Sequence, residues 1–248
     1  MEQKRVMLTV AYDGTAYSGY QIQENAPTIE GELHRALGAL LEENVKITGG
    51  SRTDAGVHAL CNVAVFDTQA RMPAEKMAYA LNRYLPDDIR VRKSCAVAAD
   101  FHPRHCDSRK TYEYRIMNTE FPVPTKRLYS HFTYVPLDAD RMREAAGYFV
   151  GEHDFKSFCS AGSQVKSTVR RIYALEVRQE GEEIILRVTG NGFLYNMVRI
   201  LAGTLMEAGR GACEPAYMAD ILAAKDRKAA GPTAPACGLC LVAYEFMP

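Results

Sequence analysis

The sequence predicts an α+β fold built from two ferredoxin-like halves with largely antiparallel sheet. Both halves mix segments of period two, typical of strands, with amphipathic segments of helical period. Strands also follow one another through short turns, as at Glu180-Gly181, which favours antiparallel pairing. With 47% hydrophobic residues, a chain of 248 residues can bury a proper core. The halves show no clear sequence identity, so any repeat is one of architecture.

The first half is predicted to follow the order β-α-β-β-α-β. Thr28 is expected to cap the first helix, although Gly31 stands where a glutamate would complete a capping box. Pro73 is expected in the first turn of the second helix. The predicted elements are strands at 6–12, 45–48, 61–66 and 89–98 and helices at 29–41 and 73–84.

The second half is predicted to contain a hairpin and three helices. Asp138 or Asp140 is expected to cap the first of these helices, which would end near residue 150. The predicted elements are strands at 111–117, 168–178, 184–189 and 239–246 and helices at 138–150, 193–208 and 216–224. We place the boundary between residues 99 and 109, which gives an N-terminal domain of 1–105 and a C-terminal domain of 106–248.

Composition and charge narrow the class of protein. No apolar run approaches the roughly 18 residues of a membrane span, and the first residues lack the apolar centre of a signal peptide. Seven scattered cysteines therefore predict reduced thiols in a cytoplasmic protein. A net charge of +0 argues against a protein that coats nucleic acid, but basic residues cluster locally. The clusters are Arg90, Arg92 and Lys93; Arg104, Arg109, Lys110 and Arg115; and Lys166, Arg170 and Arg171.

A glycine-punctuated stretch, GGSRTDAGVHA at 49–59, holds the first candidate site. Asp54 lies two residues after Arg52, between two predicted strands. An aspartate in such a turn commonly bonds nearby backbone amides and has no chemical role. Alternatively, Arg52 pairs with Asp54 and keeps it ionised, which suits a nucleophile or general base. The glycines would then let other backbone or a ligand approach closely.

Two further stretches carry candidate residues. Tyr112 and Tyr114 share one face of a predicted strand, where they form either a stacking platform for a base or part of the core. Arg199 lies among apolar residues of a predicted helix, so we expect it to be partly buried and to need a carboxylate partner.

Metal-ligand residue types also occur, but their spacing is unfavourable. His102, His105 and Cys106 are too close together to match a usual zinc pattern. Cys237 and Cys240 form a CxxC that runs into a strand and lacks a second CxxC. Metal and redox roles remain open alternatives.

Together these stretches resemble the tRNA pseudouridine synthase A family over essentially the whole chain. The motifs that carry the resemblance are YDGT at 12–15, SGYQ at 18–21, SRTDAGVHA at 51–59, FHPR at 101–104, KTYEY at 110–114, GEHDF at 151–155, NGFL at 191–194 and MVR at 197–199. The resemblance implies the pseudouridine synthase fold with RRM-like halves. It also implies a homodimer that isomerises uridine to pseudouridine in tRNA, at positions 38, 39 and 40 of the anticodon arm, without cofactor or metal.

The resemblance also implies roles for individual residues. Asp54 matches the catalytic aspartate, Tyr112 matches the tyrosine that stacks on the target base, and Arg199 matches the arginine paired with the aspartate. Arg52 matches the arginine implicated in base flipping, and Arg104 and Lys110 fall in motifs expected to bind substrate. Ser51 departs from the commoner glycine, which puts the loop geometry in doubt, and Tyr195-Asn196 replaces histidines of other members.

Three alternatives stay open at this point. A paralogue with the same chemistry would modify other uridines, in tRNA or in another RNA. A non-catalytic RNA-binding module would have the same fold without the catalytic activity. A zinc or thiol enzyme would use the histidines and cysteines named above. The residues do not choose between attack of Asp54 at C1′, forming an acylal, and a route through a glycal.

Overall fold

The computed structural model describes residues 3–163 and 165–247. The chain divides into two compact units, Met1–Asp107 with Leu241–Pro248 and Ser108–Cys240. The chain thus returns to the first unit at its end, whereas the boundaries expected from sequence kept 106–248 together. The two units are described in turn.

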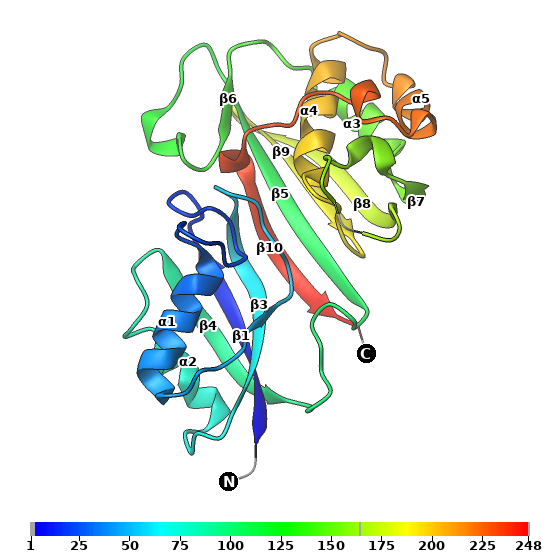
Figure 1. The fold of residues 1–248 in the computed structure, drawn as a ribbon. Helices are drawn as coiled ribbons and strands as arrows, with labels where there is room; N and C mark the ends of the chain where they lie inside the picture. The colour runs from blue at the N-terminus through cyan, green and yellow to red at the C-terminus, as the bar shows by residue number, and fades with distance from the viewer. Residues whose placement is uncertain (1–2, 164, 248) are drawn as a thin grey trace. The chain divides into compact units, whose positions relative to one another are not determined.

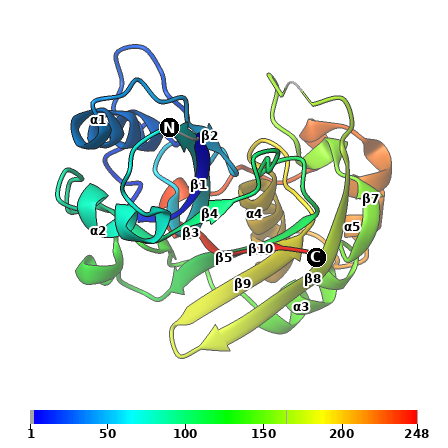
Figure 2. The ribbon, with the colours of Figure 1, turned by 90° about the horizontal axis from the view of Figure 1, so that it is seen from below.

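The first unit is an antiparallel sheet with helices on one face (Figure 1, Figure 2). Its strands lie in the order β4-β1-β3-β10, and β2 also pairs with β3. The bounds are β1 Lys4–Tyr12, α1 Ile29–Leu41, β2 Thr48–Gly49, β3 His58–Thr68, a 3₁₀ turn at Ala74–Lys76, α2 Met77–Leu81, β4 Ile89–Val97 and β10 Leu239–Phe246.

Alternation along β1 explains why this sheet forms. Val6, Leu8 and Val10 are fully buried, and the residues between them are half-buried. Helix α1 begins as expected, because the Thr28 side chain accepts a hydrogen bond from the Gly31 amide at 3.2 Å. The expected strand at 45–48 is wrong except at its last residue. Val45 and Ile47 are buried without joining the sheet, so their apolar character serves packing alone.

The second unit has a sheet in the order β5-β9-β8-β7, with β6 parallel to β5. Helix α3 packs against β8 and against α4. The bounds are β5 Ser108–Asn118, β6 His131–Thr133, α3 Ala139–Gly147, β7 Gly151–Asp154, β8 Val169–Glu180, β9 Glu183–Gly190, α4 Met197–Gly209 and α5 Tyr217–Ala224, with 3₁₀ turns at Pro124–Lys126, Lys156–Phe158, Arg227–Ala229 and Ala236–Gly238.

Most of the expected elements of this unit are present. Asp138 is the residue that caps α3, accepting from the amides of Asp140 and Arg141. The hairpin turns at Gly181, whose φ of +61° is favoured by glycine. Helix α4 begins later than expected, because Asn196 has a left-handed φ of 61° and interrupts the helical backbone.

Candidate active site

The Asp54 loop connects β2 to β3 in the first unit. Ser51 and Thr53 are 5% and 7% exposed, so the loop backbone beside them is packed inside the protein. Arg52 is exposed and Asp54 is half-buried. Ser51 and Thr53 thus anchor the loop. The charged side chains of Arg52 and Asp54 remain accessible to a ligand.

Asn62 of β3 fixes the loop through side-chain hydrogen bonds. Its side chain is fully buried; Oδ1 accepts from the Ser51 amide at 3.1 Å, and Nδ2 donates to the Ser51 carbonyl at 2.9 Å. Nδ2 also donates to the Tyr12 hydroxyl at 2.9 Å, and that hydroxyl shares a hydrogen bond of 2.7 Å with Thr53 Oγ1. The residues on both sides of Arg52 are therefore tied to the sheet by buried hydrogen bonds, which preorganises the loop.

The segment 13–20 packs over the other side of the loop. The Tyr20 amide donates to the Thr53 carbonyl at 3.0 Å, and the Gly56 amide donates to the Tyr17 carbonyl at 3.2 Å. Gly19 adopts a φ of +99°, and a Cβ on Gly14 would lie 2.0 Å from the Val57 carbonyl oxygen. These glycines are needed because backbone approaches backbone too closely for a side chain.

Ser51, the departure from the commoner glycine, fits this arrangement through its main chain. Both its amide and its carbonyl bond to Asn62. Its own Oγ is buried and has no hydrogen-bond partner within residues 3–163 and 165–247. The substitution thus preserves the backbone bonds of the loop but leaves a polar atom unsatisfied.

Arg52 does not pair with Asp54, so the alternative in which Arg52 keeps Asp54 ionised is not supported. In the described part of the chain, Arg52 makes neither an ion pair nor a side-chain hydrogen bond. An ion pair at the surface contributes only about 0–1 kcal/mol, too little to override a loop geometry set by buried hydrogen bonds. Arg52 is exposed, so its guanidinium donors remain available to a ligand.

Arg104 and the nearby histidines form an exposed turn after β4. Arg104 is exposed, and its amide donates to His102 Nδ1 at 3.3 Å. The rings of His102 and His105 stack at 3.8 Å, and burial followed by the charge of His105 lowers the pKa of His102. Among the residues that the structure describes, no three His, Cys, Asp or Glu side chains gather as a metal site.

Tyr112 and Tyr114 of β5 have different environments in the second unit. Tyr114 is fully buried and donates to the Pro235 carbonyl at 2.9 Å, so it belongs to the core. Tyr112 is 8% exposed and meets Phe193 edge to face, with ring centroids 5.2 Å apart. Phe193 thus fixes the ring plane of Tyr112. Lys110, on the same strand, is half-buried.

Arg199 lies in the first turn of α4 and is half-buried. Its Nε donates to the Ala234 carbonyl at 2.7 Å, and its Nη1 donates to Asn196 Oδ1 at 2.9 Å. Asn196 in turn donates to Ser160 Oγ at 2.9 Å. These contacts set the direction of the guanidinium. The structure therefore places Asp54, Arg52 and Arg104 in one unit and Lys110, Tyr112 and Arg199 in the other.

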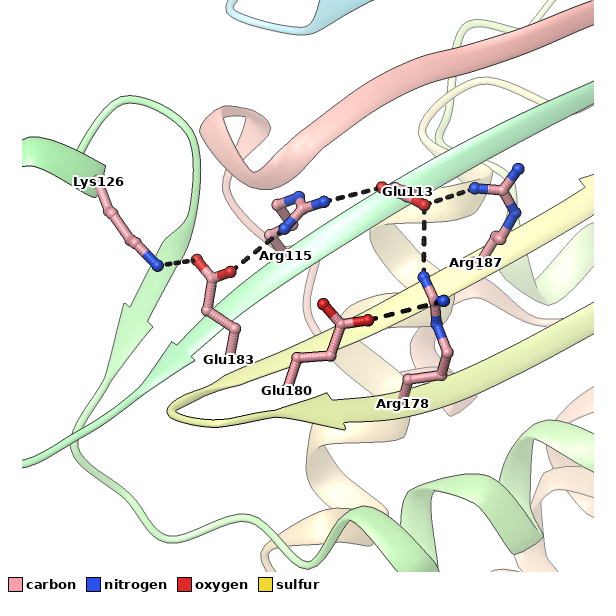
Figure 3. Close-up of polar contacts among 7 residues, drawn as sticks. All are labelled: Glu113, Arg115, Lys126, Arg178, Glu180, Glu183 and Arg187. Atoms are coloured by element: carbon pink, nitrogen blue, oxygen red, sulfur yellow. Dashed lines mark hydrogen bonds and ion pairs between the residues drawn. The ribbon is translucent and has the colours of Figure 1, made fainter.

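The sheet face opposite the two tyrosines carries a charged network that the sequence analysis missed (Figure 3). Glu113 is 8% exposed and lies 2.5 Å from Arg187, 3.1 Å from Arg115 and 3.7 Å from Arg178. Glu183 extends the network to Arg115 and Lys126. The alternation of charge with tyrosine along β5 was the available signal, and it marks the two faces of one strand.

Cys237 occupies a partly buried position that does not suit a reactive thiol. It lies in the 3₁₀ turn Ala236–Gly238, and its Sγ contacts the Ser130 carbonyl at 3.5 Å. Burial raises the pKa of Cys237, which disfavours the thiolate that redox and metal chemistry need.

The comparisons with known proteins decide the family. The family model described as tRNA pseudouridine synthase matches residues 8–105 and 145–247. The chain belongs to this family. The resemblance inferred from the motifs is therefore confirmed, as is the α+β class with mostly antiparallel sheet. Lys110 and Tyr112 lie between the two segments that the family model matches.

Curated relatives extend the similarity to nearly the whole chain. A tRNA pseudouridine synthase A of Ruminiclostridium cellulolyticum is 48% identical over 244 residues, which cover 98% of this chain and 100% of that protein. The protein of the same name from Brevibacillus brevis is 46% identical over 238 residues, 96% of this chain and 98% of the relative.

Similarity to solved structures is much weaker. A chain of the archaeal box H/ACA sRNP Nop10-Cbf5 complex aligns at a TM-score of 0.36 and 15% identity, over 81% of this chain and 44% of that one. A likeness at this level carries no argument about function. Among the described residues, no helix is long and apolar enough to cross a bilayer.

Proposed function

We propose that this chain, a member of the tRNA pseudouridine synthase family and an isomerase that converts uridine to pseudouridine in tRNA, acts at position 38, 39 and/or 40 of the anticodon arm. The observation that carries the proposal is the buried Asn62–Ser51 clamp that presents Asp54, in a chain 46% to 48% identical to proteins named tRNA pseudouridine synthase A. A fixed loop with an accessible carboxylate suits attack on a substrate held in place.

Asp54 would act at the ribose of the target nucleotide. The reaction breaks the bond from C1′ to N1, rotates the base and forms a bond from C1′ to C5. N1 gains a proton and C5 loses one, so substrate and product are isomers and no oxidant or reductant is consumed. Asp54 either attacks C1′ to form an acylal or assists loss of the C2′ proton to give a glycal. Both routes need the carboxylate ionised, which a guanidinium partner favours; Arg199 is proposed for that role.

The target base must leave its stack before this chemistry. Extrusion costs a few kcal/mol, and stacking on an aromatic ring returns about 1–3 kcal/mol. Tyr112 is proposed as the stacking residue, because Phe193 fixes its ring plane. Arg52 is proposed to hold the flipped strand, because its exposed guanidinium has no protein partner among residues 3–163 and 165–247.

The remaining parts of the proposal concern binding and assembly. Arg104 and Lys110 would contact RNA phosphates, and a homodimer would gather the basic clusters of two neutral chains around one tRNA. No cofactor or metal would be required. The seven thiols of the structure and the proposed tRNA substrate support a place in the cytoplasm.

The test uses tRNA transcripts that carry tritium at C5 of a single uridine, at position 38, 39 or 40, together with a second set labelled at uridines elsewhere in the tRNA. Wild-type protein with EDTA present should release tritium, because C5 loses its hydrogen when the bond to C1′ forms. Release only from uridines elsewhere would favour a paralogue of other specificity. Binding of RNA without release from any uridine would instead indicate an RNA-binding module and contradict the proposal.

A further inference from the structure

Arg170 is a half-buried arginine near the start of β8, opposite His153 in the register with β7. Its Nη1 donates to the carbonyls of Ser167 and Val169 at 3.0 and 2.6 Å. Its stem lies against the backbone of Gly192, where a Cβ would be 3.8 Å from Nε. Backbone contacts on two sides thus hold the side chain in one direction.

Arg170 lacks a carboxylate partner in the described part of the chain. Burial lowers its pKa, opposed only by the nearby Cys159. The neighbouring carboxylate, Asp154, is already engaged by Lys225 at 3.1 Å and by Thr168. Partial burial of a guanidinium without an anion is unfavourable. Such a residue is therefore prepared for an anion that comes from outside the chain.

The donors that remain on Arg170 suit a phosphate. The described hydrogen bonds use only Nη1, so Nε and Nη2 can contact two oxygens of one anion side by side. Lys166, four residues earlier in the chain, is also exposed. A planar fork that faces a phosphodiester is the arrangement that arginine provides and lysine does not.

The loop at 191–193, which follows β9, contacts both Arg170 and Tyr112 within the second unit. Asn191 is bonded to the main chain of Arg171 in both directions, its amide donating at 3.1 Å and its Oδ1 accepting at 3.0 Å. Gly192 follows against Arg170, and Phe193 then contacts the ring of Tyr112. An anion held by Arg170 would therefore lie on the same loop that positions the proposed stacking tyrosine.

We propose that Arg170 binds a backbone phosphate of the RNA, close to the nucleotide that stacks on Tyr112. This inference rests on the proposed function, because it takes the ligand to be the RNA substrate. The phosphate contact would hold the strand while the neighbouring base is displaced. It adds a binding residue and assigns no chemical step to it.

The test measures the Kd of an anticodon-arm RNA at several salt concentrations for wild type, Arg170→Gln, Arg170→Lys and Arg178→Gln. Loss of one phosphate contact should raise the Kd of Arg170→Gln about tenfold at low salt and reduce the salt slope of log Kd by about 0.7–0.9. Arg170→Lys should keep the slope but bind about threefold more weakly, because a point charge replaces the fork.

Arg178→Gln is the matched control, because it removes the same charge from the same strand at a residue already paired with Glu113 and Glu180. It should keep the wild-type Kd and slope. Wild-type Kd and slope in folded Arg170→Gln would overturn the inference. Should that variant fail to fold in a thermal melt, the lysine variant decides, and an unchanged Kd there overturns it.

Tritium release by the same wild-type preparation separates this inference from the proposed function. If wild type releases tritium and Arg170→Gln binds RNA with the wild-type Kd and slope, only the Arg170 contact is rejected. Absence of both release and RNA binding in wild type would reject both proposals. Tritium release by wild type, with weaker RNA binding in Arg170→Gln and unchanged binding in Arg178→Gln, would support both proposals.

Discussion

Replacing Asn62 with alanine tests whether the buried clamp controls the Asp54 loop. The variant removes the hydrogen bonds to the Ser51 amide, the Ser51 carbonyl, the Tyr12 hydroxyl and the Val63 amide. The clamp is fully buried, so the main-chain groups of Ser51 lose partners that water cannot simply replace. Each net hydrogen bond contributes about 0.5–1.5 kcal/mol, so four predict a loss of roughly 2–6 kcal/mol in the free energy of unfolding.

The effect on turnover should be separate from the effect on stability. A displacement of about 1 Å in a reacting group can cost on the order of 10²-fold in rate. We therefore expect kcat for tritium release to fall by about that factor in Asn62→Ala, with KM changed much less. The kcat of Asn62→Asp should lie between those of wild type and Asn62→Ala. The carboxylate of the variant can still accept from the Ser51 amide but cannot donate to the Ser51 carbonyl.

Asn82 provides a matched control in the same unit. Its side chain clamps Val91 in the same bidentate manner, accepting from the amide at 2.8 Å and donating to the carbonyl at 2.9 Å. Asn82→Ala should lose stability in urea denaturation but retain kcat. Wild-type kcat in folded Asn62→Ala, or an equal loss of kcat in both alanine variants, would refute the assignment of Asn62 as the residue that positions the loop.

Two further predictions concern charged pairs outside the loop. The hydrogen bonds of Arg5 hold the pKa of Asp67 below its ordinary value, so the pair stabilises the fold above the unfolded-state pKa of about 3.9. The advantage of wild type over Asp67→Asn in urea denaturation should be full at neutral pH and disappear as pH falls through the lowered pKa; a constant difference down to about pH 2 would contradict this. In the network of Figure 3, Glu113→Gln leaves Arg115, Arg178 and Arg187 facing one another. It should lower the free energy of unfolding by about 2–3 kcal/mol, less than for a fully buried pair because these arginines are 39% to 46% exposed, and added salt should reduce the loss. A loss that does not respond to salt would argue against charge repulsion as its cause.

Periodicity predicted the long elements of the fold because their own residues determine them. Strand β10 was expected at its observed bounds, and the hairpin was expected from alternation around Gly181. Strands β6 and β7 were not expected, because three and four residues carry too little pattern and their pairing depends on distant partners. The late start of α4 depends on the backbone of Asn196, which hydrophobic spacing does not reveal.

The motif that holds the candidate site could be recognised in the sequence, but the residues that support its loop could not. The motif around Asp54 was visible in the sequence and led to the family. Asn62 was missed because it acts on Ser51, eleven residues earlier, and on Tyr12, fifty residues earlier. The alternative pair of Arg52 with Asp54 does not form, because nearness in sequence does not fix the direction of side chains in a loop held by buried contacts.

The most direct test of the account is a single-turnover measurement with Asp54→Asn. Enzyme in excess over a tRNA tritiated at C5 of one uridine would be followed for release, and the Kd for the same tRNA would be measured in parallel. We expect release to fall to background while Kd and the thermal melt remain close to wild type, because asparagine preserves the shape of the side chain but cannot supply the carboxylate. Release at the wild-type rate would show that Asp54 does not perform the chemistry.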